Sequence, residues 1–339
     1  MNPSSYSIIK RLEEIYFLRK EEGVIMQEEI TGKIPRLIDE VEKVIFGKRE
    51  SIRLTIAALL AGGHVLFEDV PGVGKTMMIK TLAKAISGTF SRVQFTPDLL
   101  PSDITGVAIF NSQTNQFEFR KGPIFTTILL ADEINRTTPR SQAALLEAMS
   151  ERAVTIDNHT HLLSSHFFVL ATQNPIEFEG TYPLPEAQLD RFLFRLSIGY
   201  PSFDDELNLM LRPQQEEVEI NQVITSEEVE ELKNFVAQVY VDKQVAKYGL
   251  ELITASRNHP EIVLGISPRG SSAFIQGARA YALTQGRTYV TPEDLQNILP
   301  ATFGHRLRLE GGYYDEQRLN SVMEQLIEEV PVPIRQVRR

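Results

Sequence analysis

The sequence has no cysteine and no tryptophan, and it contains no long apolar run. Without cysteine the chain can form neither a disulfide nor a thiolate metal site, and it has no cysteine nucleophile. Apolar stretches such as residues 128–131 are far shorter than the roughly 18 residues that a membrane-spanning helix needs. The first residues lead into a charged segment at 10–14 and lack the apolar core of a secretory signal. We therefore expect a soluble, cytoplasmic protein with no membrane insertion.

Length and charge further limit the classes of protein to which the chain can belong. The chain has 339 residues, of which 42% are hydrophobic, and 35 basic against 45 acidic side chains give a formal net charge of −10. This length and composition suit two globular domains, each with its own core, and argue against disorder. The acidic balance argues against a protein that coats nucleic acid through its overall charge.

The order of apolar segments predicts an α/β domain followed by a helical one. Five candidate strands, at residues 64–68, 92–96, 127–131, 167–172 and 192–197, alternate with helical stretches. Such alternation is typical of a parallel sheet covered on both faces. Residues after Pro201 are mostly helical in pattern, which places a domain boundary near residues 199–201.

Two insertions interrupt the strand and helix alternation. Polar turns at residues 111–115 and 157–159 lie between short alternating segments and predict hairpins over 106–120 and 153–163. The sequence alone leaves open whether these hairpins have a function or merely decorate the sheet.

A glycine-rich loop follows the first candidate strand. The segment Asp69-Val-Pro-Gly-Val-Gly-Lys-Thr76 matches the phosphate-loop pattern except that Asp69 replaces its first glycine. Gly72 and Gly74 would let backbone N–H groups turn toward a phosphate, Lys75 would reach the β- and γ-phosphates, and the Thr76 hydroxyl would ligate Mg²⁺. The alternative is a strand-to-helix turn that binds nothing.

Polar residues follow two further strands. Asp132 and Glu133 end the strand at 127–131, and Asn174 follows the strand at 167–172. The carboxyl edge of a parallel sheet is where α/β folds bind ligands. Asp132 would hold Mg²⁺, Glu133 would polarise an attacking water, and Asn174 would orient that water.

Two arginines are candidates outside this cluster. Arg191 lies just before the last strand, on the far flank of the domain, where a neighbouring subunit could use it. Arg269 opens a helix of the second domain and could fold over a nucleotide. A surface ion pair is the alternative for each. His159 and His161, on the second hairpin, could bind a metal or be ordinary polar residues.

Taken together, these motifs resemble those of an AAA+ ATPase, and more narrowly those of the MoxR family, over residues 35–310. The segments that carry the resemblance are Glu68-Asp-Val-Pro-Gly-Val-Gly-Lys-Thr76, Ala131-Asp-Glu-Ile-Asn-Arg136, Glu147-Ala-Met149, Ala171-Thr-Gln-Asn-Pro175, Gly180-Thr-Tyr-Pro-Leu-Pro-Glu-Ala-Gln-Leu-Asp-Arg-Phe192 and Gly265-Ile-Ser-Pro-Arg269. Asp69 departs from the general phosphate loop but is compatible with this family's looser form.

The resemblance implies a fold and domain limits. It implies an α/β AAA+ fold: a P-loop αβα core at 35–200 with a parallel five-stranded sheet and two hairpin inserts. An all-α lid at 201–339 follows the core. Residues 1–34 lie outside the resemblance, and their charged, helix-like pattern predicts a helical extension before the core.

The resemblance also assigns site residues. Lys75 and Thr76 would be Walker A, Asp132 and Glu133 Walker B, Asn174 sensor 1, Arg191 the arginine finger and Arg269 sensor 2. The residues expected to contact ATP or Mg²⁺ are Ile45, Phe46, Gly47, Pro71, Gly72, Val73, Gly74, Lys75, Thr76, Met77 and Asp132, with Thr76 and Asp132 as metal ligands.

The function implied is ATP hydrolysis by a ring, expected to be a hexamer. The ring would remodel protein complexes or aid metal cofactor insertion, with a von Willebrand factor A domain partner and a protein client. Two alternatives stay open, a nucleic-acid-stimulated motor and a nucleotide-gated switch with little turnover. No nucleic acid partner is expected, because the tip of the second hairpin, at 157–159, has no Lys or Arg.

Overall fold

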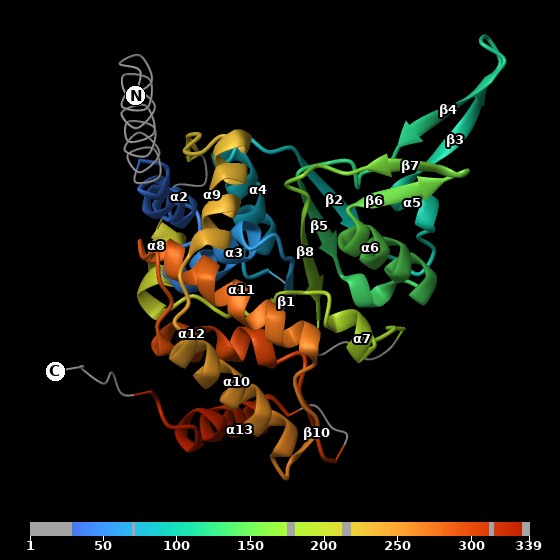
Figure 1. Cartoon of the computed structure of the whole chain (residues 1–339). Helices are drawn as coiled ribbons and strands as arrows, with labels where there is room; N and C mark the ends of the chain where they lie inside the picture. Colours follow the sequence, from blue (N-terminus) through green and yellow to red (C-terminus); the bar gives the residue numbers. More distant parts are fainter. Residues whose placement is uncertain (1–28, 70–71, 175–179, 212–217, 312–314, 334–339) are drawn as a thin grey trace, which may run out of the picture.

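The computed structural model describes residues 29–69, 72–174, 180–211, 218–311 and 315–333. A central sheet lies between two groups of helices, and a further group of helices lies below one edge of the sheet (Figure 1). The sheet has five parallel strands in the order β2-β5-β8-β1-β9. These strands are β1 (Val65–Glu68), β2 (Phe90–Gln94), β5 (Ile128–Asp132), β8 (Phe168–Gln173) and β9 (Phe194–Leu196).

Alternate residues of each strand face opposite layers, as the two-residue period of a strand requires. On β1, Val65 and Phe67 join one buried cluster, whereas Leu66 joins the other. The first cluster includes residues of α2 (Lys33–Glu42), α3 (Arg49–Leu60) and α4 (Lys75–Ala85). The second includes residues of α5 (Pro101–Thr105) and α6 (Pro139–Glu151). This is the predicted αβα arrangement, in which β1, β5 and β8 are the buried central strands and β2, at one edge, buries only Val93.

The two predicted hairpins are confirmed. One consists of β3 (Gly106–Asn111) and β4 (Gln116–Lys121), and the other of β6 (Ala153–Ile156) and β7 (His159–Leu162). The β3–β4 hairpin extends away from the body of the molecule (Figure 1). Gly106 begins it at φ +98°, where a Cβ would collide with the carbonyl oxygen of Arg120. The hairpins touch each other through Phe119 and His161, whose rings stack with centroids 4.1 Å apart.

Helices dominate the chain after the sheet. They are α8 (Phe203–Leu211), α9 (Ser226–Gln238), α10 (Lys243–Asn258), α11 (Pro268–Thr284), α12 (Pro292–Phe303) and α13 (Glu316–Glu329). The expected helical lid is therefore present, with one addition, a short antiparallel pair formed by β10 (Ile262–Leu264) and β11 (Arg308–Leu309). Short elements at the candidate site are η1 (Ile134–Arg136) and α7 (Glu186–Leu189).

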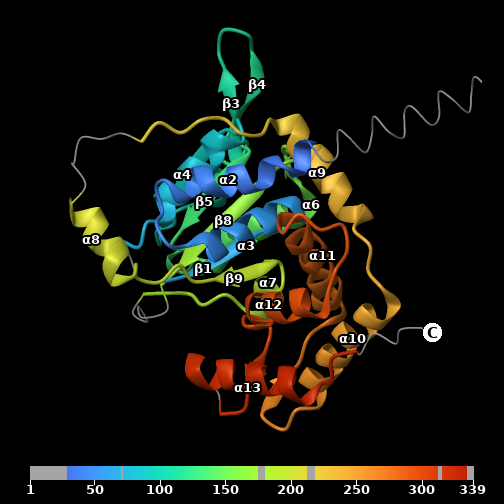
Figure 2. The same cartoon turned by 90° about the vertical axis from the view of Figure 1, so that its left-hand side faces the viewer.

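The lid shares a core with the sheet domain. Helix α11 packs against α3 (Figure 2). Side chains of α9 to α13 belong to the same buried cluster as those of β1 and α2. Ile30 and Ile34, at the end of the segment expected to be an extension, are also buried in that cluster. None of the helices in the described ranges is long and apolar enough to cross a membrane.

Candidate nucleotide-binding site

The described part of the loop between β1 and α4 has two glycines with positive φ, directly before a helix. Gly72 and Gly74 have φ values of +88° and +92°, which favour glycine because it has no Cβ. Gly74 is the N-cap of α4, so Lys75 and Thr76 occupy the first turn of that helix. The free N–H groups of a helix N-terminus attract anions. Pro71, expected at this site, lies outside the described residues.

A cavity of about 450 Å³ opens beside this loop, at the carboxyl ends of the strands. The residues that line it are Asp69, Gly72, Gly74, Lys75, Thr76, Met77, Lys80, Arg92, Gln94, Asp132, Glu133, Thr172, Gln173 and Asn174. The structure thus brings Lys75, Asp132, Glu133 and Asn174 to one cavity, from segments that together span about 100 residues of sequence.

Lys75 is the central cation of the cavity. Its Nζ donates a hydrogen bond to the backbone carbonyl of Asp69 at 3.2 Å. Partial burial lowers the pKa of Lys75, while the negative charges of Asp69, Asp132 and Glu133 act in the opposite direction. The carboxylates thus favour the charged form of the amine, and a charged amine can bind a polyanion such as a triphosphate.

Asp132 ends β5 and is held in place by two neighbouring strands. Its Oδ2 accepts hydrogen bonds from Arg92 on β2, from Nε at 3.1 Å and Nη2 at 2.6 Å. Its Oδ1 accepts a hydrogen bond from the Thr172 hydroxyl of β8 at 2.6 Å. Both carboxylate oxygens are thus fixed at the edge of the sheet.

Glu133 has an unusual backbone conformation. It is in the left-handed region, with φ +58° and ψ +50°, which is unfavourable for a residue with a Cβ. Its N–H donates to the Thr172 hydroxyl at 2.8 Å, and its Oε2 accepts from Gln94 at 2.6 Å and from Arg136 at 3.0 Å. These contacts direct the carboxylate toward the cavity.

Asn174 follows β8, the strand between β5 and β1 in the sheet. It is 9% exposed, lines the cavity, and its carbonyl oxygen accepts a hydrogen bond from Asn135 Nδ2 at 3.4 Å. A polar side chain at this position stands at the same sheet edge as Asp132, as the sequence predicts.

The donors at this edge fit a magnesium ion. Thr76 and Asp132 line the same cavity and offer a hydroxyl and a carboxylate, which are oxygen ligands of the type that Mg²⁺ prefers. Among the described residues, no cluster of three or more His, Asp or Glu side chains forms an all-protein metal site. A magnesium ion here would therefore also need ligands from the nucleotide and water, which is how Mg²⁺ usually binds in nucleotide sites.

The segment expected near adenine lies beside the loop rather than in this cavity. Ile45 is buried, and its Cδ1 lies 3.0 Å from the position of a Cβ built on Gly74. Gly47 has φ +67° and faces the carboxylate of Asp205 at the start of α8. Phe46, between them, and Val73 are half-buried and do not line the cavity.

The two candidate arginines also lie outside the cavity. Arg191 is half-buried between α7 and β9, and Arg269 is exposed in the first turn of α11. Among the described residues, neither arginine forms an ion pair.

The structure adds site residues that sequence reasoning missed. Arg92 and Gln94 point from β2 to Asp132 and Glu133, and Thr172 bonds to both of these residues. The only signal was the two-residue spacing of Arg92 and Gln94 in a predicted strand, which places them on one face. His161 stacks on Phe119, and no metal cluster includes it within the described part of the chain.

Comparisons with known proteins agree with this geometry. Residues 64–194 match the model of the ATPase family associated with various cellular activities (AAA), and residues 254–330 match the AAA lid domain. The chain is 36% identical to a candidate ATPase from Cytophaga hutchinsonii whose crystal structure is known. That similarity has a TM-score of 0.84 and covers 93% of this chain and 99% of that one.

Sequence relatives are also similar over most of their length. Uncharacterized protein YeaC of Bacillus subtilis is 49% identical over 91% of this chain and 97% of its own length. Chaperone MoxR1 of Mycobacterium tuberculosis is 39% identical over 88% of this chain and 82% of its own. Protein MoxR of Paracoccus denitrificans is 29% identical over 86% and 93%, respectively. With its AAA+ fold and helical lid, this chain belongs to the MoxR family of AAA+ ATPases.

Proposed function

We propose that the protein binds ATP with Mg²⁺ and hydrolyses it to ADP and phosphate. The observation that carries this proposal is the meeting of Lys75, Asp132 and Glu133 at one cavity beside a helix N-terminus. Phosphoryl transfer depends mainly on positioning and on neutralising charge, and these residues supply both.

Each residue then has a defined task. Lys75 binds the β- and γ-phosphates, and Thr76 and Asp132 hold the magnesium ion, which neutralises charge on the phosphates. Glu133 polarises the attacking water, and Asn174 orients it. We expect the nucleotide between a core at 35–200 and a lid at 201–339, with Ile45, Phe46, Gly47, Val73 and Met77 at its periphery. Pro71 lies outside the described residues.

We propose that Arg191 acts in trans, within a ring that is expected to be a hexamer. Its position outside the cavity of its own chain supports use by a neighbouring subunit. An arginine finger is worth about 10³ to 10⁵ in rate in other nucleotide hydrolases, so an isolated subunit would turn over slowly. Arg269, in the first turn of α11, would couple the bound nucleotide to movement of the lid.

Two variants test this reaction. Glu133→Gln should bind ATP and assemble but turn over at least about 100-fold more slowly, because it lacks the base. Arg191→Ala should lose turnover and keep its affinity for ATP, measured with a fluorescent nucleotide. Normal turnover in Glu133→Gln would refute the water-activating role, and loss of binding alone in Arg191→Ala would refute action in trans.

We further propose that the work of hydrolysis remodels a protein client or aids insertion of its metal cofactor, with a von Willebrand factor A domain protein as partner. The β3–β4 hairpin supports a protein client, because Phe110 and Phe117 are 52% and 74% exposed, with ring centroids 5.4 Å apart. Exposed apolar patches mark surfaces that bind other proteins. Since ATP is a cytoplasmic metabolite, we place this activity in the cytoplasm.

A substrate trap tests the client proposal. Glu133→Gln with ATP should retain a protein client in a pull-down, and Glu133→Gln combined with Phe117→Ser should retain less of it. Equal recovery of the client by both variants would show that client binding does not depend on Phe117 of the hairpin. Turnover that depends on added DNA would instead favour a nucleic-acid motor.

A further inference from the structure

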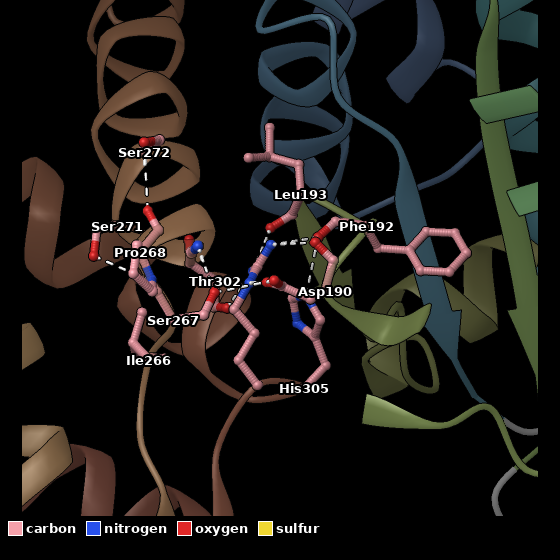
Figure 3. A network of polar contacts seen from close by, with 12 residues as sticks. Asp190, Phe192, Leu193, Ile266, Ser267, Pro268, Ser271, Ser272, Thr302 and His305 are labelled. Carbon is pink, nitrogen blue, oxygen red and sulfur yellow. Dashed lines mark hydrogen bonds and ion pairs between the residues drawn. The ribbon is translucent and has the colours of Figure 1, made fainter. Parts of the chain in front are cut away.

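A buried arginine of the lid holds the segment that contains Arg191. Arg306 follows helix α12 and is 6% exposed. Its guanidinium donates five hydrogen bonds, to Asp190 Oδ1 at 2.7 Å and to the backbone carbonyls of Phe192 at 2.6 Å, Thr302 at 2.6 Å, Leu193 at 3.1 Å and Asp190 at 3.4 Å. Figure 3 shows Asp190, Phe192 and Leu193 facing Thr302 and His305 of the lid.

The acceptors lie on both sides of Arg191 in the sequence. Asp190 precedes it and Phe192 follows it, and both bond to the same guanidinium. His305 Nε2 lies a further 3.0 Å from the Phe192 carbonyl. Burial keeps the pKa of His305 well below its ordinary value, so the ring is neutral and donates this hydrogen bond. The backbone at Arg191 is therefore fixed at each flank by the lid.

The other oxygen of the Asp190 carboxylate reaches the start of helix α11. Asp190 Oδ2 accepts a hydrogen bond from the Ser267 hydroxyl at 3.0 Å. Ser267 is also the N-cap of α11, since its Oγ accepts from the Gly270 N–H at 3.0 Å. Arg269 lies two residues after Ser267, so one carboxylate connects the segments that carry the two candidate arginines.

A buried guanidinium is costly unless its donors are paired, and its planar fork fixes partners more rigidly than an ammonium would. Here most of the donors are used on the short segment from Asp190 to Leu193. A simple apolar contact would join lid and core without fixing the orientation of this backbone. The arrangement is therefore suited to positioning what the segment carries.

We propose that Arg306 is a positioning residue for the arginine finger and that, through Asp190 and Ser267, it makes Arg191 move with the lid. This inference rests on the proposed action of Arg191 in trans. A change of lid position on nucleotide binding would then alter how a subunit presents Arg191 to its neighbour. Occupancy of one site would thus control hydrolysis at the next.

Arg306→Gln tests the positioning role. We expect ATP affinity within about twofold of wild type and a kcat about 10- to 100-fold lower, because small displacements of a catalytic group can cost about 100-fold. Arg306→Lys, which keeps the charge and loses the fork, should recover only part of the rate. Arg308→Gln is the matched control, because Arg308 makes an exposed ion pair with Glu186 at 3.1 Å and should be dispensable.

A mixing experiment separates positioning from a merely structural role. A Glu133→Gln subunit cannot activate water but still offers an intact Arg191 to its neighbour. Adding excess Glu133→Gln to Arg306→Gln should therefore raise turnover per Arg306→Gln subunit, as it should for Arg191→Ala. If Arg306→Gln instead impaired the folding of its own subunit or that subunit's own nucleotide site, the added Glu133→Gln subunits would not restore turnover.

The outcomes are distinct. Rescue of both variants supports the proposal. Rescue of Arg191→Ala without rescue of Arg306→Gln overturns the role of Arg306 and leaves action in trans intact. Rescue of neither overturns action in trans, and the role of Arg306 with it. If thermal unfolding followed by circular dichroism finds Arg306→Gln unfolded, Asp190→Asn, which removes the same ion pair, takes its place in each mixture.

Discussion

The carboxylate of Asp69 accepts a hydrogen bond from the Ser197 hydroxyl at 2.6 Å, which joins the phosphate loop to the end of the sheet. The same carboxylate accepts from the backbone N–H groups of Ile198 at 2.8 Å and Gly199 at 2.9 Å. Asp69 is 6% exposed. The residue that departs from the general phosphate-loop pattern therefore satisfies three donors in the segment that leads to the lid.

This contact predicts that restoring the usual glycine is harmful. Asp69→Gly should lower the free energy of unfolding by about 2 to 3 kcal/mol, because buried N–H groups lose a charged acceptor. Ser197→Ala, which removes one exposed donor, should cost less than about 1 kcal/mol. Urea denaturation of the two variants measures the difference. An Asp69→Gly variant as stable as wild type would show that these hydrogen bonds contribute nothing to the free energy of unfolding.

The left-handed backbone of Glu133 predicts a difference between two inactive variants. Glu133→Gly and Glu133→Ala both lose the carboxylate and its hydrogen bonds, so neither should turn over ATP. Only glycine adopts φ +58° without strain, so Glu133→Gly should be about 1 kcal/mol more stable than Glu133→Ala. Urea denaturation tests this, and equal stability of the pair would mean that no strain is held at Glu133.

Local sequence pattern predicts the central strands well and their ends less well. The expected strand at 64–68 corresponds to β1, Val65–Glu68, whose short run of apolar residues is buried in the centre of the sheet. The expected strand at 192–197 is shorter in the structure, where β9 covers Phe194–Leu196. The carbonyls of Phe192 and Leu193 bond instead to Arg306, a residue over 100 positions away that no local pattern could reveal.

Some residues of the candidate site could be predicted from local sequence, and others could not. Lys75, Asp132 and Glu133 are recognisable because each lies in a local motif at a strand end or helix start. The partners Arg92 and Gln94 are not, since the pairing of β2 with β5 depends on the order of strands in the sheet. Residues that position the motif residues thus become visible only when the tertiary structure is known.

The hydrogen bond from Gln94 to Glu133 predicts an effect on turnover. Gln94→Ala should lower kcat about 10-fold, because Arg136, which is exposed, would then be the one described residue that donates to the Oε2 atom of Glu133. ATP affinity should stay close to wild type, since the hydrogen bonds of the Gln94 side chain run to Arg92 and Glu133. Steady-state kinetics and nucleotide titration measure the two quantities separately. Gln113→Ala, in the turn of the β3–β4 hairpin, is the control and should leave basal turnover unchanged.

His64 predicts that the folded protein loses stability in mild acid. His64 is buried, with 4% of its surface exposed. Its Nδ1 accepts a hydrogen bond from the Val169 N–H at 3.0 Å, and its Nε2 lies 3.3 Å from the Met149 carbonyl oxygen. Burial lowers its pKa from 6.5 to about 4. Below pH 6.5 the unfolded chain binds a proton that the folded chain excludes, so stability falls as pH drops from 6.5 toward 4.

This loss of stability should be measurable as the slope of the unfolding free energy against pH. Between pH 6 and pH 4.5, His64 should contribute up to about 1.4 kcal/mol per pH unit to the change in unfolding free energy. His64→Gln removes the titrating group while keeping a donor and an acceptor, so its stability should depend less steeply on pH by about that amount. His159→Gln is the matched control, because that ring is exposed on the β6–β7 hairpin. Identical slopes for His64→Gln and wild type, from urea denaturation at each pH, would mean that His64 is protonated in the folded chain.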